Sequence, residues 1–92
     1  MRKILILDSR DNIAVCLADL SAGEVIEQDD IYIKVLSNIP RGHKIASHPI
    51  AKDDGIIKYG ERMGHATAAI AVGEHVHTHN VLGDRLSSEQ VK

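Results

Sequence analysis

Short apolar segments, separated by polar turn residues, run along the whole chain and show little of the periodicity of a helix. Gly, Pro, Asp and Ser stand between them at spacings typical of all-β domains. The pattern therefore predicts a mainly β domain with little helix. The predicted strands are residues 3–7, 12–17, 31–36, 44–46, 56–59, 66–71 and 75–80.

Two polar segments are predicted to be turns. Residues 8–11, Asp-Ser-Arg-Asp, would close a hairpin between the first two strands, which would then be antiparallel neighbours. Residues 27–30, Glu-Gln-Asp-Asp, are expected to form a second turn, acidic and exposed.

A short motif, apolar-x-x-Gly-x-x-apolar, recurs along the chain. Its copies are residues 20–26, 39–45 and 70–76, and a looser copy runs from Ile50 through Gly55 to Ile57. The motif predicts a turn before an apolar strand, with glycine at a positive φ that other residues avoid. Because the sequence between the copies is unrelated, the motif indicates turn-strand units within one sheet system rather than a solenoid.

Composition limits how such a domain can be filled. The 92 residues include no Phe, no Trp and only two Tyr, so the core must come from Ile, Val, Leu and Ala. A chain of this length forms one small domain with little room for an enclosed catalytic pocket. The domain is expected to span residues 1–82, with a polar tail or the start of a linker at residues 83–92.

Charge and hydropathy argue against several classes of function. The formal net charge is −2 with interspersed acids and bases, and aromatic side chains for base stacking are scarce, so no nucleic-acid partner is expected. No apolar run approaches the ~20 residues that cross a bilayer, and the apolar part of residues 1–8 is too short for a signal peptide. The single Cys16 excludes an internal disulfide and fits a reducing cytoplasm, where it is expected to be a small strand residue rather than a nucleophile.

Histidines are concentrated in residues 73–80, Gly-Glu-His-Val-His-Thr-His-Asn. In an extended strand His75, His77 and His79 would share one face, because successive side chains point to opposite sides. The segment could be a metal site, a substrate-binding edge or a solvated strand. His77 and His79 are the best candidates, roughly 6 to 7 Å apart at Cα and so able to share one substrate or metal. His75 neighbours a turn and is expected to lie at the surface or in an interface.

These two histidines cannot complete a metal site by themselves, because such a site normally has three or more protein ligands. Without further ligands, the isolated chain is expected to hold no metal. A cupin-like interpretation, with His-x-His on a strand, also needs a following Glu and a later His. Neither follows Asn80, so that interpretation is not favoured.

Other polar residues could contact a substrate. Lys58 and Tyr59 stand at a predicted strand end, where an ammonium and a phenol can reach a polar ligand, although Tyr59 could equally pack on the surface. His43 and Lys44 follow Pro40 in a predicted turn, at a loop tip, and Lys44 could bind a carboxylate or be a snorkelling surface lysine. Asn80 could orient a hydroxyl or cap the strand end.

Five segments of the chain form a recognisable pattern in this order: residues 11–15, 22–24, 40–44, 57–60 and 73–80. Together they resemble the small N-terminal domain, or separate small subunit, of the altronate and galactarate dehydratase family. This domain belongs to the SAF group, named for sialic acid synthase, antifreeze proteins and flagellar or pilus assembly proteins. The resemblance covers residues 3–80, and small subunits of sulfolactate sulfo-lyases look similar too.

The resemblance implies a β-clip fold, in which bent hairpins fold over one another around a thin core. It also implies a sugar-acid hydro-lyase in which a large catalytic domain or subunit carries most of the site, with a divalent metal, iron or manganese. In that enzyme His77, His79 and Lys58 would serve catalysis, and His77 and His79 would hold the metal together with further ligands from the partner. The alternatives are a sulfo-lyase small subunit and a non-catalytic SAF binding module, and a homo-oligomer is possible.

Overall fold

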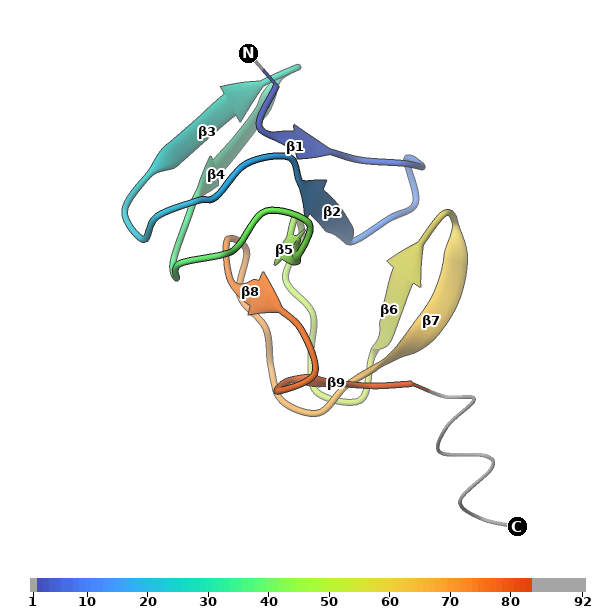
Figure 1. Cartoon of the computed structure of the whole chain (residues 1–92). Coiled ribbons are helices and arrows are strands. Elements are labelled where there is room, and N and C mark those ends of the chain that lie inside the picture. The colour runs from blue at the N-terminus through green and yellow to red at the C-terminus, as the bar shows by residue number, and fades with distance from the viewer. Residues whose placement is uncertain (1, 84–92) are drawn as a thin grey trace, which may run out of the picture.

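In the computed structural model, which describes residues 2–83, the apolar segments form short antiparallel strands, and none of these residues is in a helix. The mainly β, SAF-like β-clip domain predicted from the sequence is confirmed. The strands are β1 (Ile4–Leu5), β2 (Ile13–Cys16), β3 (Val25–Gln28), β4 (Ile31–Lys34), β5 (Lys44–Ala46), β6 (Gly55–Lys58), β7 (Glu61–Ala66), β8 (His75–Val76) and β9 (Val81–Leu82) (Figure 1).

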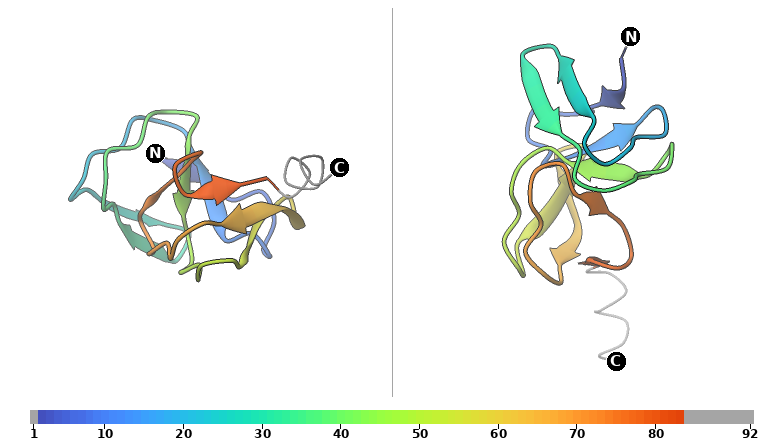
Figure 2. Two further views of the ribbon diagram at one scale, coloured as in Figure 1. Left: turned by 90° about the horizontal axis from the view of Figure 1, so that it is seen from below. Right: turned by 90° about the vertical axis from the view of Figure 1, so that its left-hand side faces the viewer.

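The strands form three small sheets, in the orders β1-β2-β5-β8, β3-β4 and β6-β7-β9. In space, the hairpins β3–β4 and β6–β7 lie at opposite ends of the described structure, with β2 and β5 between them (Figures 1 and 2). The predicted hairpin β1–β2 is confirmed. The predicted acidic turn also exists, although it is shorter than expected: it joins β3 to β4 through Asp29 and Asp30, which have φ values of 49° and 66°.

The recurring sequence motif forms four similar turns, which we call the motif turns. The positive φ predicted for glycine is found at Gly23 (93°), Gly42 (87°) and Gly73 (91°). The looser copy was wrongly aligned, because its turn position is Asp53 (φ 75°) and Gly55 lies in β6. In every motif turn the fourth N–H donates to the first carbonyl at 3.0–3.1 Å, in the pairs Glu24 to Ser21, His43 to Pro40, Asp54 to Ala51 and Glu74 to Ala71.

The motif turns are bonded to one another in two reciprocal pairs. Gly23 N–H donates to the carbonyl of Val35, which begins the segment leading into the second turn. Gly42 N–H donates to the carbonyl of Cys16, which begins the segment leading into the first turn, and both distances are 2.8 Å. The third and fourth turns repeat this exchange, with Asp53 donating to Ala66 and Gly73 donating to Ala46.

A two-way backbone bridge closes each pair. Leu20 and Ile39 exchange both hydrogen bonds at 2.9 Å, and Ile50 and Ile70 do so at 2.9 and 2.7 Å. All four side chains are 1–2% exposed. Each bridge therefore satisfies buried backbone groups where no regular strand exists, and its side chains fill the core.

Two hydrophobic clusters form the core, and the central strands contribute to both. Ile13 of β2 and Ala46 of β5 face one cluster, whereas Ala14 and Ile45 face the other. This alternation follows from the two faces of a strand. As the composition predicts, the buried hydrophobic residues among those described are Ile, Val, Leu, Ala and Cys, and both tyrosines are exposed.

Two predicted strands differ from the structure. Residues 66–71 do not form a strand of their own, because Ala66 is the last residue of β7. The segment after it is a loop, which forms an isolated backbone bridge from Ile70 to Ile50. Residues 75–80 are extended only in β8, and residues 77–80 turn back. The pattern also did not identify β3, β7 and β9 as strands. In β3 only Ile26 is buried, the first three residues of β7 are exposed, and β9 is a short edge strand beside β7.

The predicted tail at residues 83–92 lies, apart from Gly83, outside the described residues. Among the described residues there is no helix that could span a membrane.

The two glycines Gly73 and Gly23 allow a matched test of the turns. Both have a positive φ, so an alanine at either should cost about 1–2 kcal/mol of unfolding free energy. A Cβ at Gly23 meets open space, whereas one at Gly73 overlaps the carbonyl oxygen of Lys34. We expect Gly73→Ala to cost at least a further ~2 kcal/mol in denaturant unfolding, since that backbone contact leaves no room to adjust. Equal losses for the two variants would contradict this packing.

Candidate functional site

Histidines from two distant parts of the chain meet at the edge of the four-stranded sheet. His43 is the last residue of the second motif turn, directly before β5, and His75 lies in β8. Because β5 pairs with β8, Nδ1 of His43 lies 2.9 Å from Nε2 of His75. His77 joins them, and one ring nitrogen from each of the three residues lies within 4.8 Å of the others.

The rings of four histidines are in contact. His77 stacks on His43 with centroids 4.3 Å apart and an interplanar angle of 21°. His75 is the centre of the group, since its ring lies 5.1 Å from His43, 5.5 Å from His77 and 5.2 Å from His79. We call these four residues the histidine cluster.

Asn80 holds the turn that brings His77 to this position. Its side-chain oxygen accepts the His77 N–H at 2.9 Å, and its side-chain nitrogen donates to the His75 carbonyl at 2.9 Å. Asn80 is only 5% exposed, and its own N–H closes the turn onto the His77 carbonyl at 3.1 Å. This placement favours the alternative in which Asn80 caps the strand end over the one in which it orients a substrate hydroxyl.

Burial lowers the pKa of His75. Desolvation is the largest cause, and the neighbouring imidazoles of His43, His79 and His77 add to it, because a charge on any of them repels a charge on His75. The neutral form of His75 is therefore favoured. A neutral imidazole can accept a hydrogen bond or ligate a metal.

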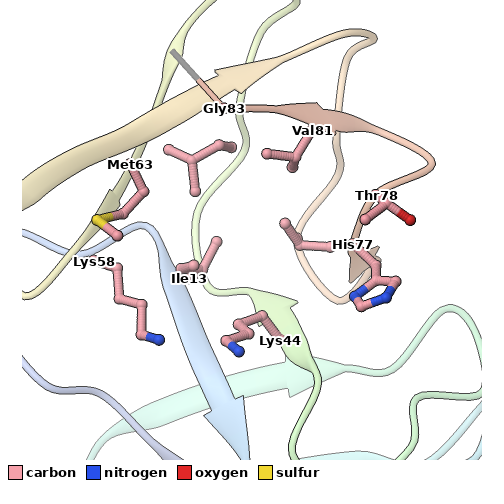
Figure 3. A pocket seen from close by; sticks show the side chains of 10 residues that line it. Ile13, Lys44, Lys58, Met63, His77, Thr78, Val81 and Gly83 are labelled. Carbon is pink, nitrogen blue, oxygen red and sulfur yellow. The ribbon is translucent and has the colours of Figure 1, made fainter. Parts of the chain in front are cut away.

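An open hollow of about 300 Å³ lies on the other face of β5. Lys44 pairs with Val76 in the strand register and both line the hollow, whereas the neighbouring register pair joins Ile45 to His75. The amino groups of Lys44 and Lys58 lie on one side of the hollow (Figure 3). The lining residues are Ile13, Lys44, Ile56, Lys58, Met63, Val76, His77, Thr78, Val81 and Gly83.

His77 belongs to both features, because it lines the hollow and stacks on His43. Of the residues predicted from sequence, the structure thus brings Lys44, Lys58 and His77 together around the hollow. His43 reaches them only through the histidine cluster.

Tyr59 takes a different position, at the tip of the β6–β7 hairpin. Its φ is 58°, its side chain is 57% exposed, and its ring lies 5.1 Å from the Lys58 amino nitrogen. At this distance the ring can attract the ammonium through a cation–π contact. Tyr59 can therefore hold the Lys58 side chain in position. Lys58 lines the hollow and Tyr59 does not.

Sequence reasoning missed two polar residues that anchor this hairpin. The Asp11 carboxylate, 2% exposed, accepts the Gly60 N–H at 2.8 Å. The Asn12 side chain accepts the Ile57 N–H at 2.8 Å and donates to the Gly55 carbonyl at 2.9 Å. The only sequence signal is the pair of turn-forming residues before β2, which indicates local bonding and not these distant partners.

Cys16 packs in the core as expected. It is 1% exposed, and burial raises the pKa of its thiol to about 11. The thiol therefore stays protonated at neutral pH and is a poor nucleophile.

The donor set of the cluster fits a metal. Neutral imidazoles are good ligands for divalent iron and related first-row ions, and three of them converge in His43, His75 and His77. This trio differs from the predicted pair, His77 and His79. Of the other three rings in the cluster, His79 contacts only that of His75. His75, expected at the surface or in an interface, is partly buried at the centre.

Comparisons with known proteins agree with the fold. The sequence family described as altronate/galactarate dehydratase SAF domain matches residues 2–84. The altronate dehydratase of Bacillus subtilis is 40% identical over 80 residues, 87% of this chain and 16% of that protein, and that of Escherichia coli is 47% identical over 70 residues, 76% of this chain and 14% of that protein. The chain therefore spans about one-sixth of these relatives.

A third relative is a protein of similar size. The (2R)-sulfolactate sulfo-lyase subunit alpha of Chromohalobacter salexigens is 43% identical over 60 residues, which are 64% of this chain and 64% of that subunit.

Replacing Asn80 tests its role in the turn. We expect Asn80→Ala to reduce the free energy of unfolding by about 1–3 kcal/mol, because the His77 N–H and the His75 carbonyl lose their partner. Thr78→Ala, in the same turn but exposed, is the control and should change it by less than ~0.5 kcal/mol. If Asn80→Ala left the free energy of unfolding unchanged, the capping role would be wrong and the Asn80 side chain would be available to contact a substrate.

The lowered pKa of His75 predicts a pH dependence of stability in the metal-free chain. The unfolded chain takes up a proton at His75 near its ordinary pKa of about 6.5, before the folded chain does. The contribution of His75 to the free energy of unfolding should therefore be fully present above that pH. It should be lost as the pH falls from there toward the lower pKa of the folded chain. Thermal unfolding with a chelator present, from pH ~7.5 to ~5, should show a smaller fall for His75→Gln than for the wild type. An identical fall in the variant and the wild type would contradict a lower pKa of His75 in the folded chain than in the unfolded chain.

Proposed function

Because this chain belongs to the altronate/galactarate dehydratase SAF domain family, we propose that it is the small component of a hydro-lyase that removes water from a sugar acid. A larger catalytic domain or subunit completes the active site. The observation that carries the proposal is the hollow, which the side chains of Lys44, Lys58 and His77 all line.

Each of these side chains suits one part of a dehydration. The reaction removes a proton next to a carboxylate and protonates the departing hydroxyl. Lys44 and Lys58 supply positive charge that can bind and orient the substrate carboxylate. A ring nitrogen of His77 can accept or donate a proton at the reacting carbon or hydroxyl while that ring is not bound to the metal. His79, also exposed at the cluster, is proposed as a second such group.

The hollow is open, which is why a partner belongs to the proposal. A weak carbon acid reacts faster where water is excluded and charges are fixed, and an exposed surface of a 92-residue chain provides neither. A large domain docked over the hollow would close it. We place the assembled enzyme in the cytoplasm, where the buried, reduced Cys16 is compatible with the redox conditions.

A divalent metal, iron or manganese, is proposed as the cofactor of the complete enzyme. The imidazoles of the histidine cluster would hold it together with groups of the partner. When bound, such an ion stabilises the negative charge that develops on the carboxylate as the proton leaves. Tyr59, His43 and Asn80 remain predictions as substrate contacts. Of these three residues Tyr59 is the most exposed, at 57%, and so it is the most accessible to a partner-bound substrate.

A sulfo-lyase is the second candidate, favoured by the 43% identity to the sulfolactate sulfo-lyase subunit alpha. In this reaction a sulfite group leaves in place of hydroxide, so the same proton removal and carboxylate binding are needed.

The assay uses the full chain assembled with a large catalytic chain of the same family. Altronate, galactarate and sulfolactate are offered in parallel, and release of the keto acid is measured. We expect turnover of one sugar acid. Turnover of sulfolactate alone would support the sulfo-lyase instead, and no turnover in an assembled complex would favour a non-catalytic SAF module.

Variants in the same complex test the residues. His77→Gln should lower kcat by about 10²–10⁴-fold, because it removes a proton-transfer group. Lys44→Met or Lys58→Met should raise KM by about 10-fold or more, because each removes a charge-assisted hydrogen bond. Lys52→Met, at an exposed position outside the hollow, is the matched control. If all three hollow variants behaved like this control, the hollow would not be the site.

A further inference from the structure

We propose that this chain binds a divalent first-row transition metal without any partner, through His43, His75 and His77. This deepens the proposed function, and it rests on that function only for what the metal does in catalysis. It also replaces the pair predicted from sequence, His77 and His79 completed by a partner, with three ligands of this chain.

The spacing of the ring nitrogens fits shared ligation. Two nitrogens bound at right angles to one ion, with bonds of about 2.1 Å, lie about 3 Å apart. The His43 Nδ1 and His75 Nε2 atoms are 2.9 Å apart. The largest separation within the trio is no more than 4.8 Å, and His77 is exposed, so a small rotation of its ring can bring its nitrogen to the same ion.

Backbone bonds hold the two partly buried ligands in place. The His43 carbonyl accepts the Cys16 N–H at 2.9 Å, as part of the first pair of motif turns. The His75 N–H donates to the Ser37 hydroxyl at 3.1 Å, and its carbonyl accepts the Asn80 amide at 2.9 Å. A site whose ligands sit on fixed backbone loses little freedom when the ion binds, and this favours affinity.

The chemistry of the trio selects the class of metal. Three imidazoles suit zinc, iron, nickel and cobalt better than magnesium or calcium, which prefer oxygen ligands. Because the three ligands are neutral, the ion keeps its full charge, and the exposed side of the cluster leaves positions for oxygen ligands. This is the arrangement of catalytic rather than structural metal sites.

The competing explanation is a plain hydrogen bond between the two rings. One imidazole of the His43–His75 pair would donate to the other, and the stacked His77 ring would have no ligand role. The two explanations differ in what the isolated chain does with a metal.

The test titrates the 92-residue chain alone with Co²⁺, and binding is followed by visible absorption and equilibrium dialysis. We expect one Co²⁺ per chain. His43→Gln, His75→Gln and His77→Gln should each weaken binding by more than about 100-fold, since loss of a ligand should exceed the cost of losing an outer-shell partner. His79→Gln should change it only a few-fold, and His48→Gln, outside the cluster, is the matched control.

The comparison of His43→Gln with His79→Gln is decisive. A large loss for His79→Gln and none for His43→Gln would overturn the assignment in favour of the sequence-based pair. Absence of Co²⁺ binding by the wild-type chain would overturn it in favour of the ring–ring hydrogen bond.

A second measurement needs no variant and so does not depend on their folding. Mn²⁺ added to the wild-type chain should broaden the ring resonances of His43, His75 and His77 in NMR spectra and leave those of His48 sharp. Uniform broadening of all histidines would contradict a specific site. Both measurements are independent of enzyme activity, so a chain that binds Co²⁺ yet supports no dehydration would refute the proposed function while leaving the metal site intact.

Discussion

The structure depends on the reciprocal bonding of the motif turns. Each turn offers an N–H at its positive-φ residue to a carbonyl at the start of the segment that leads into its partner turn. Because the exchange is mutual, neither turn of a pair can be complete without the other. This arrangement satisfies buried backbone groups in a chain whose strands are only two to six residues long. It also explains how a core without Phe or Trp can hold together, since the bridging residues Leu20, Ile39, Ile50 and Ile70 are all buried.

The same turns position the chemistry. The second turn ends at His43 and releases the chain into β5, so His43 and Lys44 project to opposite faces of the sheet. The fourth turn releases the chain into β8, where His75 and Val76 alternate in the same way. Gly73 sits against the Lys34 backbone and its carbonyl accepts the Leu36 N–H at 2.9 Å, which joins the two turn pairs. The histidine cluster and the lysine-lined hollow are therefore two sides of one strand pairing, and His77 connects them.

Gathering four imidazoles has an electrostatic consequence. Loss of hydration, and after it the neighbouring imidazoles of His43, His79 and His77, lower the pKa of His75, so the neutral form of this central ring is favoured. A neutral ring is suited to ligation and to proton transfer, and Lys44 and Lys58 line the hollow on the other face. In the proposed enzyme, this division would place the metal ligands on one side and the carboxylate-binding lysines on the other. A larger partner docked at this edge would cover both.

The sequence by itself determined the local features: a mainly β chain, an aliphatic core, the β1–β2 hairpin, and the glycines that take positive φ in three of the four motif turns. These follow from side-chain size and backbone sterics within a few residues. Only the tertiary structure decided that Asp53 takes the fourth turn position, that residues 77–80 turn back, and that His43 meets His75. The last contact joins residues 32 positions apart through the pairing of β5 with β8. Strand pairing between distant short segments depends on how the whole core packs, and no local pattern specifies it.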